Sequence, residues 1–148
     1  MDSRVVLRAV VLSAALGLTC LPALAGAPSD GLRLGAPGTA LPSRQAPADG
    51  DLSIAVAAPE SPVTATHVLL RQHGSSEVLQ RTADGFFVPG GTNSERLADT
   101  GARPVDGVLT FKILNEPLEG LSYPLTIVLI ARTADGVLTG EFTVEPRR

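Results

Sequence analysis

Apolar and polar residues alternate in short runs over the last two thirds of the chain. Each run is three to nine residues long and rich in Val, Ile, Leu, Thr or Phe, and Gly, Pro or Asp separates it from the next. A period of two predicts β-strands, because successive side chains of a strand point to opposite faces of its sheet. Seven strands are expected, over residues 51–58, 64–72, 77–82, 86–88, 107–114, 125–132 and 137–145.

The last two runs carry the strongest pattern. Residues 125–132 are apolar at odd and even positions alike, as in a central strand that is covered on both faces. Residues 137–145 alternate, which predicts that Phe142 is buried and Thr143 exposed. The Asp-Gly dipeptide at 135–136 favours the positive φ angles of a type I′ turn, so we expect these two strands to pair antiparallel.

A five-residue sequence, Arg-Thr-Ala-Asp-Gly, occurs at residues 81–85 and again at 132–136. It indicates either an internal duplication or the repeated use of one turn chemistry. We favour the second interpretation, because Asp and Gly recur in turns for physical reasons and no longer period accompanies the match.

These strands predict an all-β domain over residues 51–148, an antiparallel β-sandwich of about seven strands. In strand count and in the alternation of its faces it resembles an immunoglobulin-like sandwich. The resemblance is architectural, because the Cys–Trp–Cys core of antibody domains is absent: the chain has no Trp and one Cys.

The first 25 residues have the features of a secretory signal peptide. Arg4 and Arg8 precede or flank an apolar run over residues 9–18, and Ala23-Leu24-Ala25 matches the small-x-small cleavage pattern. The run is too short for a membrane span, which needs about 20 apolar residues. We therefore expect cleavage after Ala25, a periplasmic or secreted protein, and no membrane insertion afterwards; an uncleaved anchor is the alternative.

Cys20 lies within this predicted signal peptide. Lipidation there is disfavoured, because the preceding residues, Gly17-Leu18-Thr19, depart from a lipobox, which has Leu three places before the cysteine and a small residue just before it. A chain cut after Ala25 has no cysteine, so a disulfide and thiol chemistry are excluded.

Residues 26–50 are rich in Pro, Ala and Gly and show no apolar periodicity. Such a composition buries too little apolar surface to offset the entropy lost on ordering. The sequence predicts a flexible linker before the sandwich domain.

Charge and aromatic content exclude several function classes. Loss of residues 1–25 removes two Arg and one Asp, which leaves ten basic and fourteen acidic residues and a net charge of −4. This balance disfavours nucleic acid and anionic membrane surfaces as partners. With no Trp, one Tyr and four Phe, the chain also lacks an aromatic platform for stacking sugars or bases.

No catalytic, metal or cofactor site is predicted. His67 and His73 would lie about 20 Å apart on one continuous strand, too far to share a metal ion. Neither a Gly-x-Ser-x-Gly elbow nor a phosphate-binding Gly-rich loop is present. Asp49 and Asp51 could contribute to a calcium site, but the remaining oxygen ligands cannot be named, so a solvated turn is favoured.

The longest irregular segment, residues 89–104, is the candidate binding loop. Loops of this length inside a compact domain are uncommon and often functional, although an inter-sheet crossover is the simpler interpretation. Its polar side chains with the reach to contact a partner are Asn93, Glu95, Arg96 and Arg103.

We expect a non-catalytic binding or structural module of the bacterial envelope that recognises a protein partner through loops or an edge strand. The alternative is a periplasmic assembly factor or chaperone that holds its client by strand addition. A secreted enzyme is disfavoured, because no catalytic constellation is found.

Overall fold

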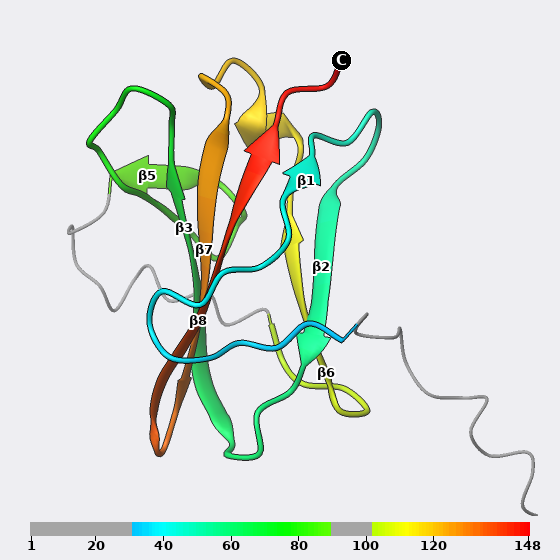
Figure 1. Cartoon of the computed structure of the whole chain (residues 1–148), viewed down its shortest axis with the longest axis vertical. Coiled ribbons are helices and arrows are strands. Elements are labelled where there is room, and N and C mark those ends of the chain that lie inside the picture. Colours follow the sequence, from blue (N-terminus) through cyan, green and yellow to red (C-terminus); the bar gives the residue numbers. More distant parts are fainter. Residues whose placement is uncertain (1–30, 90–101) are drawn as a thin grey trace, which may run out of the picture.

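The computed structural model describes residues 31–89 and 102–148, which form eight strands and a single 3₁₀ turn (Figure 1). No helix in these two ranges is long and apolar enough to cross a membrane. The elements are β1 (Arg44–Gln45), β2 (Leu52–Ala57), β3 (Val63–Arg71), β4 (Leu79–Arg81), β5 (Phe87–Pro89), β6 (Val108–Ile113), η2 (Glu116–Leu118), β7 (Leu125–Thr133) and β8 (Gly136–Glu145).

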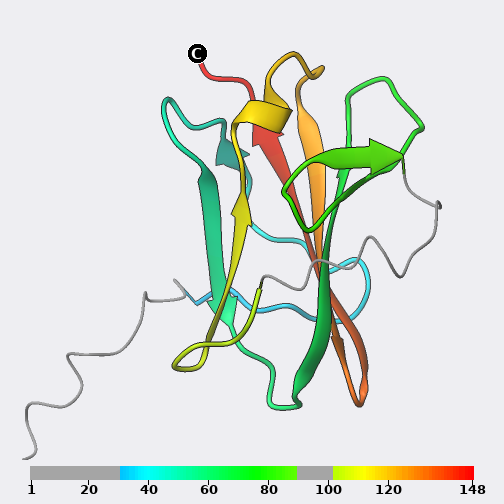
Figure 2. The same cartoon turned by 180° about the vertical axis from the view of Figure 1, so that it is seen from behind.

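The strands form two layers. Six of them make one sheet in the order β1-β8-β7-β3-β4-β5, and β2 and β6 make a two-stranded sheet that lies against it (Figures 1 and 2). The all-β class is confirmed. The antiparallel arrangement and the strand count need correction, because β1 is an eighth strand and pairs parallel to β8, so the larger sheet is mixed.

A single core joins the two layers. The period of two places one set of side chains from each sheet in the space between them, where they are nearly or completely buried. The two-stranded sheet contributes Ile54, Val56, Leu109, Phe111 and Ile113, and the larger sheet contributes Val68, Leu70, Leu125, Ile127, Leu129, Ala131, Phe142 and Val144.

The predicted pairing of the last two strands and the burial of Phe142 are confirmed, but the predicted exposure of Thr143 is not. β7 lies inside the sheet, paired antiparallel with β3 on one side and with β8 on the other. Phe142 is 3% exposed and Glu141 is exposed, whereas Thr143 is half-buried. Thr139 points to the same outer face as Thr143 but is buried, because residues 36–38 lie against it. Its hydroxyl group accepts from the Gly38 N–H and donates to the Ala36 carbonyl.

The turn type predicted at residues 135–136 is wrong. Thr133 pairs with Gly136, so Ala134 and Asp135 form the two-residue turn, and neither has the positive φ that a type I′ turn requires. A different Asp-Gly dipeptide, Asp106-Gly107, has the geometry of a type I′ turn: φ is 49° and 77°, and Val105 and Val108 bond to each other across it.

The repeated Arg-Thr-Ala-Asp-Gly sequence lies at a hairpin turn in both places. At 81–85 it joins β4 to β5, and the Thr82 hydroxyl accepts from the Phe86 N–H. At 132–136 it joins β7 to β8, and the Thr133 hydroxyl accepts from the Asp135 N–H. The same five residues therefore form a turn in both places, but the two turns differ: Arg81 pairs with Phe87 across the first, whereas Thr133 pairs with Gly136 across the second.

The segment before β2 is paired along β8 in its described part, which begins at residue 31. Gly35 and Thr139 exchange two main-chain bonds, Leu41 donates to Glu141, and β1 follows in register with the end of β8. Leu32, Leu34, Leu41 and Ala46 pack against the core. The composition of residues 26–50 predicts a flexible linker here. The leucines of this segment are isolated and follow no period, so the sequence pattern does not indicate that they pack against the same core.

Candidate functional site

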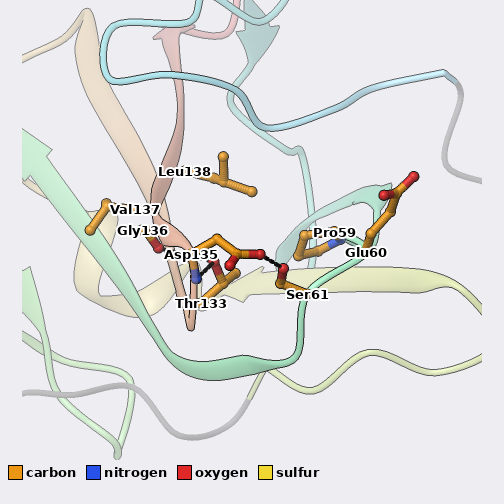
Figure 3. Close-up of a pocket in the computed structure, with 8 residues that line it drawn as sticks. All are labelled: Pro59, Glu60, Ser61, Thr133, Asp135, Gly136, Val137 and Leu138. Atoms are coloured by element: carbon orange, nitrogen blue, oxygen red, sulfur yellow. Dashed lines mark hydrogen bonds between the residues drawn. The ribbon is translucent and has the colours of Figure 1, made fainter.

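A hollow of about 310 Å³ lies at one end of the two layers, between the β2–β3 loop and the β7–β8 hairpin (Figure 3). Both connections are short, so the side chains at their tips are held close to the strand ends from which they emerge. The hollow is lined by Pro59, Glu60, Ser61, Thr133, Asp135, Gly136, Val137 and Leu138.

One threonine hydroxyl group holds the β7–β8 turn together. Thr133 Oγ1 donates to the Gly136 carbonyl at 3.1 Å and accepts from the Asp135 N–H at 3.3 Å. Ser, Thr and Asp side chains commonly bond to neighbouring main-chain groups in turns. The side chain of Asp135 is thereby directed toward the neighbouring loop.

A hydrogen bond joins the two sides of the hollow. The Ser61 hydroxyl group donates to Asp135 Oδ2, and the two residues face each other in Figure 3. The bond connects residues 74 positions apart in the chain. It fixes the β2–β3 loop against the β7–β8 hairpin.

A second hollow, of about 190 Å³, adjoins the first. Pro59, Glu60 and Leu138 line both, and residues 33–34 and 57–58 complete the second. Because they share these three residues, we treat the two hollows together and call them the loop-end groove. It is built from three segments: the chain before β1, the β2–β3 loop and the β7–β8 hairpin.

The loop-end groove combines an apolar surface with carboxylates. Pro59 and Leu138 are half-buried and Val137 is 39% exposed, while Glu60 and Asp135 are exposed. Arg33 lies at the far end, in the second hollow. Such a surface fits an aliphatic stem that ends in a positive charge, as in Lys or Arg of a partner.

Most of the binding loop that the sequence predicts lies outside the described residues. This applies to Asn93, Glu95 and Arg96, which fall in residues 90–101. Arg103 is described and exposed, and it stands between that stretch and β6. Arg103 is therefore the one member of this predicted site that lies within the described residues.

The two histidines occupy different environments. His67 is 7% exposed on the outer face of β3, where Nδ1 lies 3.0 Å from Gln80 Nε2 and Nε2 accepts from Arg132 Nε at 3.2 Å. His73 is exposed in the loop after β3. Both ring nitrogens of His67 are thus engaged by side chains of the sheet.

Asp51, the candidate calcium ligand, pairs with a lysine. Its carboxylate lies 3.1 Å from Lys112 Nζ and accepts from the Asn115 N–H. The Lys112 ammonium, followed by the Asn115 N–H, holds the pKa of Asp51 below its ordinary value. Within the described ranges no group of three or more His, Cys, Asp or Glu residues could hold a metal ion.

The depressed pKa of Asp51 predicts an acid-sensitive contribution to stability. A carboxylate whose pKa is lower in the folded state stabilises the fold above its unfolded pKa and loses that effect as the pH falls through the folded value. We expect Asp51→Asn to lower the free energy of unfolding at neutral pH and to match the wild type once the pH is well below about 4.

Denaturant unfolding at a series of pH values measures this effect. Asp49→Asn, at a nearby exposed carboxylate, is the matched control and should reproduce the wild-type profile. A constant difference between Asp51→Asn and the wild type across the acid range would contradict the assignment.

No protein-family model matches the chain, and a search of curated proteins finds no matching sequence.

Proposed function

We propose that this chain is an exported, non-catalytic binding module that recognises a protein partner through the loop-end groove. The observation that carries the proposal is the groove itself: two connections far apart in the chain meet, bond to each other and enclose an apolar hollow with exposed carboxylates. Binding residues lie most often on loops that a rigid scaffold positions.

We also propose that the scaffold is an immunoglobulin-like sandwich of the variable type. That fold carries strands G, F, C, C′ and C″ in one sheet and B and E in the other. Taken in chain order, β2 to β8 correspond to strands B, C, C′, C″, E, F and G. The sheet orders β8-β7-β3-β4-β5 and β2-β6 then match these two sets. Tyr123 lies two residues before the buried Leu125 that begins β7, which matches the spacing of the tyrosine corner.

In variable domains the B–C and F–G loops belong to the recognition end of the sandwich. The equivalent connections here are the β2–β3 loop and the β7–β8 hairpin, which line the groove. The strand order and the position of the hollow therefore both support the proposal that this end of the domain is the binding surface.

Strand addition, on which the chaperone alternative depends, has less support on the larger sheet. Its outermost strands are short: β5 has three residues and ends at Pro89, and β1 has two and lies between Pro42 and Pro47. Short strands and prolines are the usual protection of a sheet edge against pairing with another chain. We therefore favour recognition through the groove.

Site-specific photo-crosslinking in the native envelope tests this proposal. A photoreactive phenylalanine derivative at Val137, in the groove, should give a discrete covalent adduct with another protein. The same group at Ser76, exposed in the loop after β3 at the other end of the domain, is the control. Equal labelling at both positions, or no adduct at Val137, would contradict the proposal.

Charge reversal at the groove tests the chemistry of the partner. Glu60→Lys should abolish or strongly reduce the Val137 adduct, because it replaces a carboxylate that would face a cationic side chain. Glu119→Lys, a change at an exposed glutamate outside the groove, should leave the adduct unchanged. An adduct that persists with Glu60→Lys would show that the partner does not bring a positive charge to this site.

A further inference from the structure

The outer face of the six-stranded sheet, which points away from β2 and β6, carries a small apolar area. Leu69 on β3 and Val128 on β7 are directly paired, and both are half-buried. Together with Val78, which is 39% exposed, they border a hollow of about 120 Å³. Ile130, two residues further on β7, extends the apolar area along the strand.

This apolar area is not required by the core. β7 already buries its other face through Leu125, Ile127 and Leu129, and the two-stranded sheet covers only that inner face. The outer face of a sheet in contact with water normally carries polar side chains, and apolar areas there often mark interaction sites.

Two opposite charges flank the same hollow. Glu141 on β8 is paired with Val128, and Arg71 on β3 is paired with Thr126, so the charges lie on the two sides of β7 and are offset along it. Both side chains are exposed. Among the described residues the ion pair formed is Lys112–Asp51, and neither Arg71 nor Glu141 takes part in one.

We propose that two copies of this chain associate through this face, about a two-fold axis that lies in the plane of the contact, runs obliquely along β7 and is equidistant from Arg71 and Glu141. Such an axis brings each Arg71 opposite the Glu141 of the second copy, because the two charges lie on opposite sides of it. Val128 lies beside the axis, so it packs next to the Val128 of the second copy. The patch is self-complementary, as a two-fold interface requires.

The homodimer does not depend on the proposed function. The hollow at the dimer face and the loop-end groove share no lining residue. A dimer would therefore present two grooves, and the failure of either proposal leaves the other standing.

Sedimentation velocity of the purified chain, from about 1 to 100 µM, tests the dimer with two charge reversals. Arg71→Glu and Glu141→Arg should each raise the dissociation constant by about tenfold or more, since each reversal places like charges together at both symmetric contacts. Mixing the two variants should restore association, because the mixed dimer has opposite charges at both contacts.

Glu119→Arg, an exposed reversal outside this face, is the control and should leave association unchanged. Thermal unfolding confirms that each variant is folded. The proposal is overturned if the wild type is monomeric up to about 100 µM, if the single reversals do not weaken association, or if the mixture does not restore it.

Discussion

Replacing Phe142 with Ala should lower the free energy of unfolding by about 3–5 kcal/mol. The ring is 3% exposed and packs in the core from β8, opposite Ile127 on β7. Its removal leaves a cavity that a close-packed interior fills only in part. Small domains have about 5–15 kcal/mol of stability in total, so this substitution should remove a large part of it.

Thr143→Ala is the matched control for Phe142→Ala. Thr143 is the next residue on β8 and points to the outer face, where it is half-buried. Its substitution should change the free energy of unfolding by less than about 1 kcal/mol. Urea unfolding of both variants measures the difference. A larger effect at Thr143 would mean that β8 is shifted by one residue, which exchanges its two faces.

The alternation of apolar and polar residues predicts the elements of this fold better than it predicts their connections. It identifies seven of the eight strands, and the apolar character of residues 125–132 on both faces correctly places β7 between two neighbours. β1 is missed, because two residues are too few to show a period. The parallel pairing of β1 with β8 depends on a contact across a hundred residues.

The turn chemistry illustrates a second limit. Asp-Gly occurs five times in the chain, and of the four occurrences that lie wholly within the described ranges, at 49–50, 84–85, 106–107 and 135–136, only the one at 106–107 has the positive φ of a type I′ turn at both residues. At 135–136 the register of β7 and β8 places Thr133 opposite Gly136, so the corner falls one residue earlier. The core positions on both strands fix that register, and this preference outweighs the preference of the dipeptide.

The loop-end groove has the weakest signal in the sequence. Its residues come from three separated segments, and each, taken alone, has the composition of an ordinary turn or loop. The Ser61–Asp135 hydrogen bond that joins two of them is visible only once the strands are paired. The sequence indicates a binding loop in residues 89–104 because that irregular segment is unusually long. The segments that form the groove have no comparable feature.

A chain that begins at Asp51 should lose about 3 kcal/mol or more of unfolding free energy relative to a chain of residues 26–148. The deletion removes Leu32, Leu34 and Leu41, which are half-buried against the core, and a fully buried Leu contributes about 1.5–3 kcal/mol. It also removes the main-chain hydrogen bonds that Gly35 and β1 make with β8, so the corresponding groups of β8 lose their partners. Urea unfolding of the two chains measures the loss.

Gly140→Ala tests the same contact without a deletion. A Cβ at Gly140 would lie 2.6 Å from Leu41 Cδ1 and 2.8 Å from Leu34 Cδ2, so these two side chains, or the segment that carries them, must shift. Overpacking of this kind lowers stability by about 1–3 kcal/mol. Because Leu41→Ala removes the closest of these atoms, the double variant should lose less than the sum of the single losses. Additive losses, together with an Asp51 chain within about 1 kcal/mol of the chain of residues 26–148, would show that residues 26–50 are the flexible linker that their composition predicts.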